Sequence, residues 1–344
     1  MEASAKRDNV KDYYGKVLTD TSGLKTSACS SRSAPHPTVC RIIRTQVPAA
    51  VNDRFFGCGN PIPLGIGGMD VLDLGSGSGR DSYVAAALVG PAGSVTGIDM
   101  TDEQLEVARA NVAPFAETLG FQPKIRFLTG YIEDLAAAGV TCASVDLCIS
   151  NCVVNLSHDK HAVLAGVFAA LRPGGELHFA DMYCDRRLSA SLSDNKVLHG
   201  EGLAGALYVP DFERMAYDIG FAAPRVLDAK RIDIFAPELR ALVGAAQYFS
   251  VTYRLFKPDN ATPQAAAVDR VAVYKGSVDG CEREYALDIS NTFAAGKPTR
   301  VSVETAAVLE SSWLSKHFTL EPCSAAAAEP GSTSTTTLSM LQAL

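Results

Sequence analysis

The sequence has little positive charge and no long apolar segment. Its 344 residues include 31 Lys and Arg against 38 Asp and Glu, a formal net charge of -7. Nucleic acids and anionic membrane surfaces both select basic proteins, so we expect neither as a partner. No apolar run approaches the roughly 20 residues that a membrane-spanning helix needs. The first residues, MEASAKRDNVKDYYGKVL, lack the apolar stretch of a secretory signal, and we expect a cytoplasmic protein.

The cysteines lack a recognisable metal-binding spacing. There are nine, and no two form the C-x-x-C pattern of a zinc ribbon or a thioredoxin-type site. In a reducing compartment we expect most of them to be free thiols. Three are expected to be small, buried hydrophobic side chains, namely Cys142, Cys148 and Cys281. The six histidines do not have the spacing of metal ligands either.

From residue 69 onward, strand and helix patterns alternate. Buried-strand patterns occur at 69–74, 94–99, 124–130, 145–151 and 176–182. Helical patterns lie between several of them, at 80–88, 101–112 and 161–171, and another follows at 211–221. This alternation predicts an α/β fold with a doubly wound, mainly parallel sheet and right-handed crossovers.

The composition divides the chain into four regions. Residues 1–64 form an arm with helices expected at 8–20 and 38–51, and residues 65–225 form the α/β core. Residues 226–322 are expected to form a smaller α+β domain, in which 270–276 pairs with 283–289 as antiparallel strands. Residues 323–344 contain few bulky apolar side chains, so we expect a disordered tail.

A glycine-rich loop follows the first strand of the predicted core. It stands between a strand and a helix, the context in which such loops bind nucleotides. A dinucleotide fingerprint would need its third glycine at the position of Arg80. The shorter G-x-G-x-G pattern favours a ligand without a pyrophosphate, such as S-adenosyl-L-methionine. Arg80 and Asp81 begin the next helix and are expected to cap it or to pair on the surface. The candidate binding residues of the loop are Gly75, Ser76, Gly77 and Gly79.

Residues after the neighbouring strands complete the expected donor site. Asp99 ends the second strand, where it can accept hydrogen bonds from ribose hydroxyls, and Met100 can lie against an adenine face. Ile132 and Glu133 follow the third strand, where the adenine edge should lie. Asp73 is expected near the methionine end of the donor. The joint pattern predicts a Rossmann-like class I methyltransferase core.

A cysteine, Cys152, ends the fourth strand of the same unit. Ligands of doubly wound sheets bind outside the carboxyl ends of the strands, so this thiol should face the donor, with Asn151 and Val153 bordering it. A soft thiolate prefers a soft, thiophilic centre, and trivalent arsenic is one that keeps a lone pair. Cys29 and Cys58 in the arm could supply further sulfur ligands. The alternative is that Cys152 only packs.

The chain resembles the arsenite methyltransferases over almost its full length. The segments that carry the resemblance are DYYGKVL, LKTSAC, FFGCG, VLDLGSGSGRDSYV, VTGIDMT, ISNCVVNL, KVLHGEGLAGALY and TYRLFK. The resemblance implies an S-adenosylmethionine-dependent enzyme that methylates trivalent arsenic, delivered as thiol conjugates of arsenite or methylarsenite, in arsenic detoxification. It also implies that cysteine pairs become disulfides as arsenic changes oxidation state, and that a thiol reductant such as glutathione or thioredoxin restores them.

By matched motif, the arsenic ligands are Cys29, Cys58 and Cys152, and the helix that carries Tyr14 covers the donor. The family usually has a fourth cysteine where this chain has Gly202, and Cys184 could replace it or could be a rim or core residue. We therefore expect a monomeric enzyme with a three-thiol site. Two alternatives are a methyltransferase for a small organic acceptor and a metalloid-binding protein with weak turnover.

Overall fold

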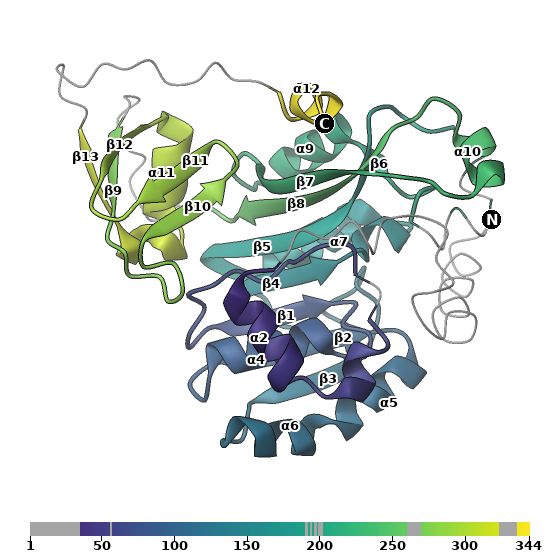
Figure 1. The fold of residues 1–344 in the computed structure, drawn as a ribbon, viewed down its shortest axis with the longest axis horizontal. Helices are drawn as coiled ribbons and strands as arrows, with labels where there is room; N and C mark the ends of the chain where they lie inside the picture. Colours follow the sequence, from purple (N-terminus) through teal and green to yellow (C-terminus); the bar gives the residue numbers. More distant parts are fainter. Residues whose placement is uncertain are drawn as a thin grey trace.

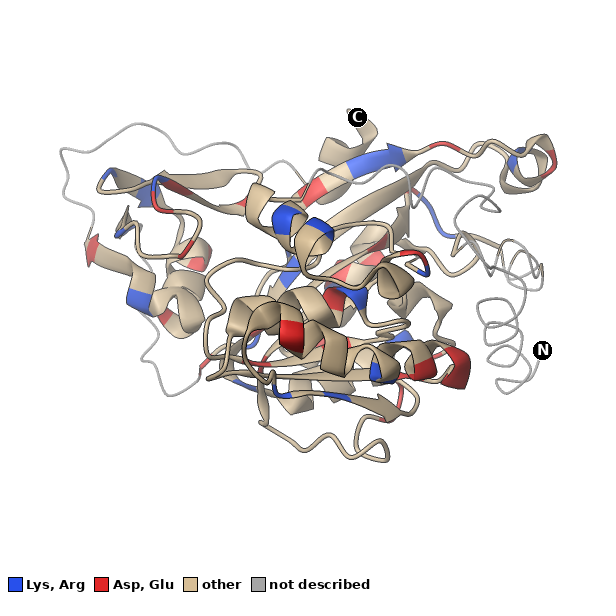
Figure 2. Ribbon diagram, turned by 60° about the horizontal axis from the view of Figure 1, so that its bottom comes forward, with Lys and Arg blue, Asp and Glu red and all other residues tan. Residues whose placement is uncertain are grey.

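The computed structural model describes residues 35–55, 57–189, 192, 195, 198, 202–259, 270–322 and 336–344. They form a large central sheet with helices on both faces and a smaller group of strands at one end (Figure 1). Within this part of the chain, no helix is long and apolar enough to cross a membrane. Acidic and basic residues are interspersed along the ribbon (Figure 2). The helix predicted at 8–20 lies outside the described residues.

The large sheet has the strand order β3-β2-β1-β4-β5-β8-β7, with β6 beside the end of β5. Strands β1 to β5 pair in parallel, whereas β8 runs antiparallel to both of its neighbours. The fold is therefore α/β with a mainly parallel sheet, as predicted. The bounds are β1 Asp70–Leu74, β2 Ser94–Asp99, β3 Ile125–Thr129, β4 Val145–Asn151, β5 Leu171–Cys184, β6 Leu207–Tyr208, β7 Arg225–Ile232 and β8 Tyr248–Phe256.

Alternating side chains of the strands build a separate core on each face of the sheet. On β1, Val71 packs into one hydrophobic cluster, whereas Leu72 and Leu74 pack into the other. The cluster around Val71 includes side chains of α2 Pro37–Thr45, α3 Ala49–Asn52, α4 Arg80–Val89, α5 Asp102–Ala110 and α6 Val112–Leu119. The cluster around Leu72 includes side chains of α7 Lys160–Ala170, α9 Val209–Ile219 and α12 Thr337–Gln342.

The C-terminal region adds two small antiparallel sheets at one end of the molecule (Figure 1). The predicted pairing of 270–276 with 283–289 is wrong. β10 forms a hairpin with β11, which follows it after a two-residue turn, so β9 pairs instead with β12 and β13. The elements are β9 Arg270–Tyr274, β10 Glu284–Asp288, β11 Asn291–Ala294, β12 Pro298–Val301, α11 Val303–Ser311, the 3-10 helix η5 Trp313–His317 and β13 Phe318–Pro322.

Three predicted boundaries differ from the structure. The single helix expected at 38–51 is two helices, α2 and α3, separated at Pro48, which has no backbone N–H for a continuous helix. The core does not end at residue 225 as predicted, because β7 and β8 belong to the same large sheet. Both faces of β8 are buried, so this strand is an interior part of the core. The region predicted to be a disordered tail contains a helix, α12, which places Leu341 in the cluster with α7 and α9. In the sequence, the short helix α10 Pro237–Val243 connects β7 to β8.

Candidate active site

An open cavity with about 1030 Å³ of empty space lies at the carboxyl ends of β1, β2 and β4. The strand order reverses between β1 and β4, which is where ligands of doubly wound sheets bind. The arm reaches this cavity, since Arg54, Phe55 and Gly57 line it. Tyr14 lies outside the described residues. The predicted donor residues that line the cavity are Asp73, Gly75, Ser76, Gly77, Asp99, Met100, Ile132, Glu133, Asn151 and Val153.

Two glycines of the loop leave space in the cavity because they carry no side chain. Gly77 has a φ of 53°, and a Cβ there would project into open space. Gly75 has a φ of 62°, and a Cβ there would lie 2.5 Å from Cγ1 of Val153, so only glycine lets the end of β4 approach the loop. The predicted fourth loop residue, Gly79, lies outside the cavity lining and is the N-cap of α4. We call the loop segment 75–77 the glycine cradle. Its exposed backbone fits a nucleoside ligand.

Two carboxylates line the cavity next to the cradle, Asp73, which is buried, and Asp99, which is partly exposed. Asp99 accepts hydrogen bonds from the backbone N–H of Gly77 at 2.9 Å and of Thr101 at 2.8 Å. Burial raises the pKa of Asp99, and these backbone bonds oppose the rise. Burial also raises the pKa of Asp73, to which the nearby charge of Asp81 contributes, while Ser82 donates to Asp73 at 2.5 Å. Asp99 is thus held by the loop that forms the cradle, and Asp73 is held by the first turn of α4.

Glu133 is fixed by the segment that follows β4. Its Oε1 atom accepts a hydrogen bond from Ser157 at 2.7 Å and lies 3.1 Å from Nδ1 of His158. Ser157 also lines the cavity, at the end of the 3-10 helix η3 Val154–Leu156. These contacts hold the Glu133 carboxylate at the cavity edge predicted for the adenine.

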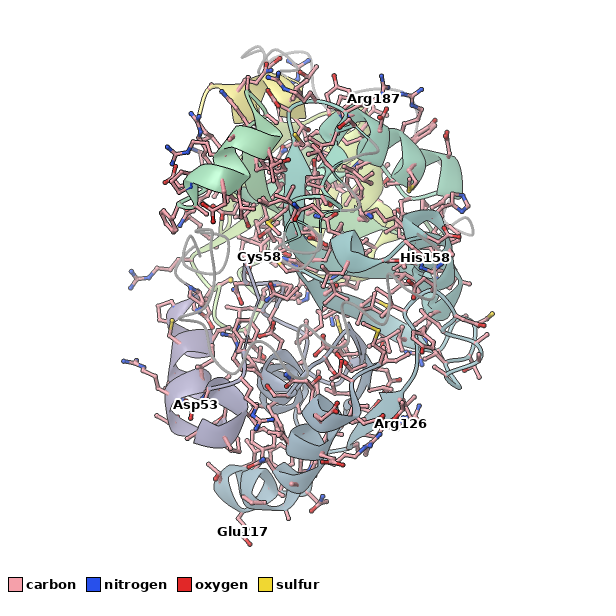
Figure 3. All side chains as sticks on the ribbon, turned by 90° about the vertical axis from the view of Figure 1, so that its right-hand side faces the viewer. Asp53, Cys58, Glu117, Arg126, His158 and Arg187 are labelled. Carbon is pink, nitrogen blue, oxygen red and sulfur yellow. A yellow bond between two sulfur atoms is a disulfide. The ribbon has the colours of Figure 1, made fainter. Side chains whose placement is uncertain are left out.

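Two of the three predicted arsenic ligands lie together beside this cavity. Cys58 and Cys152 form a disulfide, with their Cα atoms 5.7 Å apart. Figure 3 shows Cys58 near the centre of the molecule, where the residue is only 1% exposed to solvent. Cys152 lines the cavity and has a φ of 60°, a left-handed conformation that is unusual for a residue other than glycine. Cys29 lies outside the described residues.

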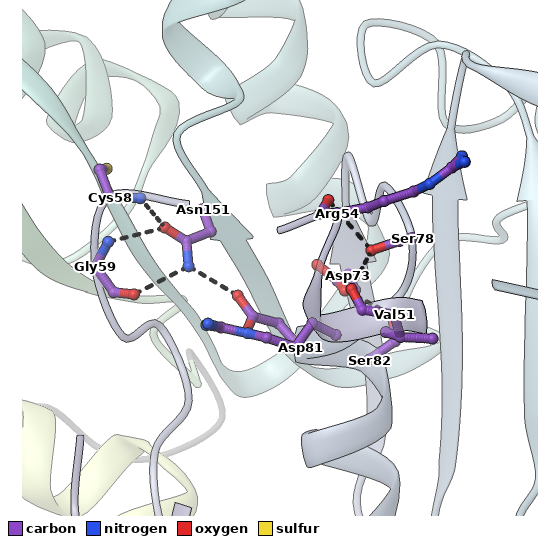
Figure 4. A network of polar contacts seen from close by, with 10 residues as sticks. Val51, Arg54, Cys58, Gly59, Asp73, Ser78, Asp81, Ser82 and Asn151 are labelled. Carbon is purple, nitrogen blue, oxygen red and sulfur yellow. Dashed lines mark hydrogen bonds and ion pairs between the residues drawn. The ribbon is translucent and has the colours of Figure 1, made fainter. Parts of the chain in front are cut away.

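Asn151 links the segment that contains Cys58 to the start of α4, which directly follows the donor loop (Figure 4). Its Oδ1 atom accepts hydrogen bonds from the backbone N–H of Cys58 at 2.9 Å and of Gly59 at 3.0 Å. Its Nδ2 atom donates to the carbonyl of Gly59 at 3.1 Å and to Oδ2 of Asp81 at 2.7 Å. The sequence identified Asn151 as a residue bordering the donor but gave no sign of this contact with the arm.

Arg80 and Asp81 were expected at the surface or as helix caps, and this expectation is wrong. Both are buried, at 7% and 4% exposed, and they form an ion pair at 2.8 Å. The Arg80 guanidinium also lies over the ring of Phe55. Their adjacent positions at a helix start look like ordinary surface charges, so the only sequence signal was the neighbouring glycine loop.

The remaining cysteines do not join the site in the described part of the chain. Cys184 is buried in a separate hydrophobic cluster, and burial raises the pKa of its thiol to about 11. Cys148 is buried as expected, whereas Cys142 is exposed and Cys281 is partly exposed, contrary to expectation. Cys142 lies in the turn before β4, where its side chain is exposed to solvent and does not pack into the hydrophobic core. Among the described residues, no three His, Cys, Asp or Glu side chains are grouped so as to hold a metal ion.

Comparison with known proteins gives consistent matches along the chain. Residues 67–220 match a methyltransferase domain, and residues 267–341 match the arsenite methyltransferase C-terminal domain. The arsenite methyltransferase of Aquipseudomonas alcaligenes is 44% identical over 90% of this chain and 89% of its own length. The chain belongs to the arsenite methyltransferase family. It is thus a methyltransferase.

Other arsenite methyltransferases give the same result. The mouse protein is 42% identical over 94% of this chain and 85% of its own length. A crystal structure of an arsenic(III) S-adenosylmethionine methyltransferase from Chlamydomonas reinhardtii is 48% identical, covering 88% of this chain and all of that one, with a TM-score of 0.79.

Gly202 stands where the resemblance to the family implies a fourth cysteine. Gly202 has a φ of 75°, and a Cβ there would lie 2.1 Å from Cε of Met182. A cysteine at this position would need both a left-handed backbone and a displaced Met182 side chain. The local structure of this chain is therefore adapted to glycine at residue 202.

Proposed function

We propose that this chain methylates trivalent arsenic, using S-adenosylmethionine as the methyl donor, in arsenic detoxification. The observation that carries the proposal is the placement of the Cys58–Cys152 pair beside the glycine cradle. The donor supplies an electrophilic methyl group on a sulfonium sulfur. The cradle residues Gly75 and Gly77 would bind it through the backbone, with Asp99 held ready for its ribose.

The thiols would hold the acceptor. Arsenic bound to the thiolates of Cys29, Cys58 and Cys152 keeps a lone pair, which needs only alignment with the methyl group for in-line transfer. As the methyl group leaves its sulfur, the arsenic lone pair becomes the new arsenic–carbon bond, and the formal oxidation state of arsenic rises by two. Closure of Cys58 and Cys152 to a disulfide releases two electrons, which returns arsenic to the trivalent state. A thiol reductant, such as glutathione or thioredoxin, would then reopen the disulfide in the cytosol.

Arsenic speciation tests this function directly. The chain is incubated with arsenite, S-adenosylmethionine and glutathione, and the products are separated by their arsenic content. We expect methylated arsenicals and a consumption of S-adenosylmethionine that requires both arsenite and thiol. Donor consumption without arsenite would favour a small organic acceptor. Binding of arsenite with no methylated product would favour a metalloid-binding protein.

Two single variants test the three-thiol assignment. A methylated arsenical has one fewer open bonding position than arsenite, so it needs only two sulfur ligands. We therefore expect Cys29→Ser to lose methylation of arsenite but to retain methylation of methylarsenite, whereas Cys58→Ser loses both. Equal activity of the Cys58→Ser variant and the unaltered chain on both substrates would contradict the assignment.

A further inference from the structure

The side-chain amide of Asn151 has a partner for each of its hydrogen-bonding positions. Its oxygen accepts two backbone hydrogen bonds from residues 58 and 59, and its nitrogen donates one bond to Gly59 and one to Asp81. An amide can make two bonds on each side, so none of its capacity is left for another group. The contacts join the end of β4 to a segment that lies more than 90 residues earlier in the sequence. This connection is made by hydrogen bonds and is separate from the sulfur–sulfur bond.

The packing around Cys58 requires this close approach. A Cβ on Gly57 would lie 2.5 Å from Cγ of Asn151, and a Cβ on Gly59 would lie 2.3 Å from Cβ of Ala180 in β5. The carbonyl of Cys58 also accepts a hydrogen bond from Ser250 of β8 at 3.3 Å. The two glycines on either side of Cys58 thus let its backbone lie directly against Asn151 and the sheet.

Asp81 fixes which way the Asn151 amide faces. Nε and Nη2 of Arg80 donate to Oδ1 of Asp81 at 3.0 and 2.8 Å, which leaves Oδ2 for Asn151. Asp81 belongs to the first turn of α4, directly after the loop that forms the donor cradle. Because a carboxylate only accepts hydrogen bonds, it selects the orientation in which the amide nitrogen points toward α4 and the oxygen toward Cys58.

We propose that Asn151, oriented by Asp81, is a positioning residue that keeps the Cys58 thiol beside the Cys152 thiol when the disulfide is open. The proposal deepens the proposed function, since it rests on this pair being the arsenic site. Two thiols that are already adjacent act at a high effective concentration, whether they close a disulfide or bind the same arsenic atom. The Asn151 contact would also connect the arsenic ligands to the donor loop through α4.

The disulfide equilibrium measures this effective concentration without arsenic. In the exchange, two glutathione molecules reduce the pair to two thiols and become one glutathione disulfide. The full-length chain is equilibrated in mixtures of reduced and oxidised glutathione, the thiols are trapped, and the Cys58–Cys152 disulfide is quantified by peptide mass spectrometry. If arsenic were not the substrate, this equilibrium would still test the positioning role, so the two proposals can fail separately.

Asn151→Asp is the main variant, because it keeps the shape of the side chain but removes both donated hydrogen bonds. Its second oxygen would face the Gly59 carbonyl and the Asp81 carboxylate. We expect the equilibrium constant for disulfide formation to fall by at least about tenfold, equivalent to roughly 30 mV for a two-electron couple. In the double variant Asn151→Asp/Asp81→Asn, residue 81 can donate to residue 151, and we expect a partial recovery.

The matched control is Asn155→Asp, four residues further along. Asn155 is also buried and also donates its amide to a backbone carbonyl, that of Met182, but no hydrogen bond among the described residues joins it to the Cys58 segment. We expect its disulfide equilibrium to stay within about twofold of the unaltered chain, a difference well below 1 kcal/mol. Equal falls in the two single variants, or an unchanged constant in Asn151→Asp, would overturn the proposal.

Asp81→Asn alone provides a test that does not need Asn151→Asp to fold. It retains an oxygen that can accept from Asn151 but loses the charge that pairs with Arg80, so the amide is less firmly oriented. The expected change is a smaller fall in the same equilibrium constant. Thermal unfolding is followed for all variants, and an unchanged constant in a folded Asp81→Asn variant would exclude a positioning role for Asp81.

Discussion

Cys58 and Cys152 are 94 residues apart in the sequence, yet a disulfide joins them at the rim of the donor cavity. One comes from the arm and the other from the end of β4, so only the folded chain brings them together. A closed disulfide offers no thiolate to arsenic. Under the proposed function, a catalytic cycle that starts from this state would therefore begin with two-electron reduction of the pair.

Replacing Cys152 with serine should abolish the arsenic chemistry while leaving the fold intact. A hydroxyl is a hard ligand with low affinity for trivalent arsenic. We expect the rate of methylarsenical formation from arsenite to fall at least about tenfold, or about 1.4 kcal/mol in activation free energy. The control is Cys142→Ser, an exposed free cysteine, which should retain the full rate. The same rate in both variants would contradict the assignment of Cys152.

Gly57→Ala should misplace Cys58 without removing any sulfur. The added Cβ would lie 2.5 Å from Cγ of Asn151 and 2.2 Å from Cζ of Phe55, so the segment must shift. A displacement of about 1 Å in an active site can cost up to roughly 100-fold in rate, and we expect a loss of 10- to 100-fold. Gly67→Ala is the control, because a Cβ there meets nothing within 4 Å. The measurement is arsenite methylation at saturating donor.

Asp181 should make the stability of the protein depend on pH. Burial raises the pKa of Asp181 to about 7, against an ordinary value of 3.8. The folded chain therefore holds a proton that the unfolded chain has already released, and the contribution of this group falls as the pH rises toward 7. Backbone N–H groups of Asn155 and Met182 donate to its two oxygens.

Asp181→Asn removes this titration, so the pH dependence should become flatter. Urea unfolding at pH 6 and pH 8 gives the free energy of unfolding of each form. We expect it to fall more in the unaltered chain than in the variant, by on the order of 1 kcal/mol. An equal fall in both would show that Asp181 keeps an ordinary pKa.

The buried ion pair of Arg254 and Glu176 should hold the C-terminal region to the large sheet. Nε of Arg254 donates to Oε1 of Glu176 at 2.7 Å, and Nε1 of Trp313 donates to Oε2 at 2.8 Å. Burial alone would raise the pKa of Glu176, but the Arg254 charge and its hydrogen bonds hold it below its usual range. Arg254 also donates to the carbonyl of Leu287 in β10.

Arg254→Ala leaves the Glu176 charge buried without its cation. We expect a loss of roughly 3–5 kcal/mol in the free energy of unfolding, measured by denaturant. Trp313 is the single tryptophan of the chain, so its fluorescence reports on this interface. Arg187→Ala removes an exposed ion pair with Asp211 and should leave the unfolding midpoint unchanged. Equal midpoints for the two variants would refute the role of the buried pair.

Much of the donor site could be predicted from local sequence. The glycine loop follows β1, Asp99 ends β2 and Glu133 lies four residues after the end of β3, and parallel strands bring their carboxyl ends to one edge of the sheet. Strand pairing in the C-terminal region could not be predicted in this way. The strand at 270–274 has the same pattern whether its partner is the nearest strand or a later one, and the hairpin between β10 and β11 decided the outcome.

The sequence by itself determined the α/β fold and the glycine cradle, because strand periodicity and glycine placement are local properties. The tertiary structure alone decided that Arg80 and Asp81 are buried, that Cys142 is exposed, and that Asn151 binds the backbone of Cys58. Burial and contacts between distant segments depend on which surfaces meet when the arm packs against the sheet. A charged pair at a helix start has the same local pattern whether it faces water or another segment of the chain.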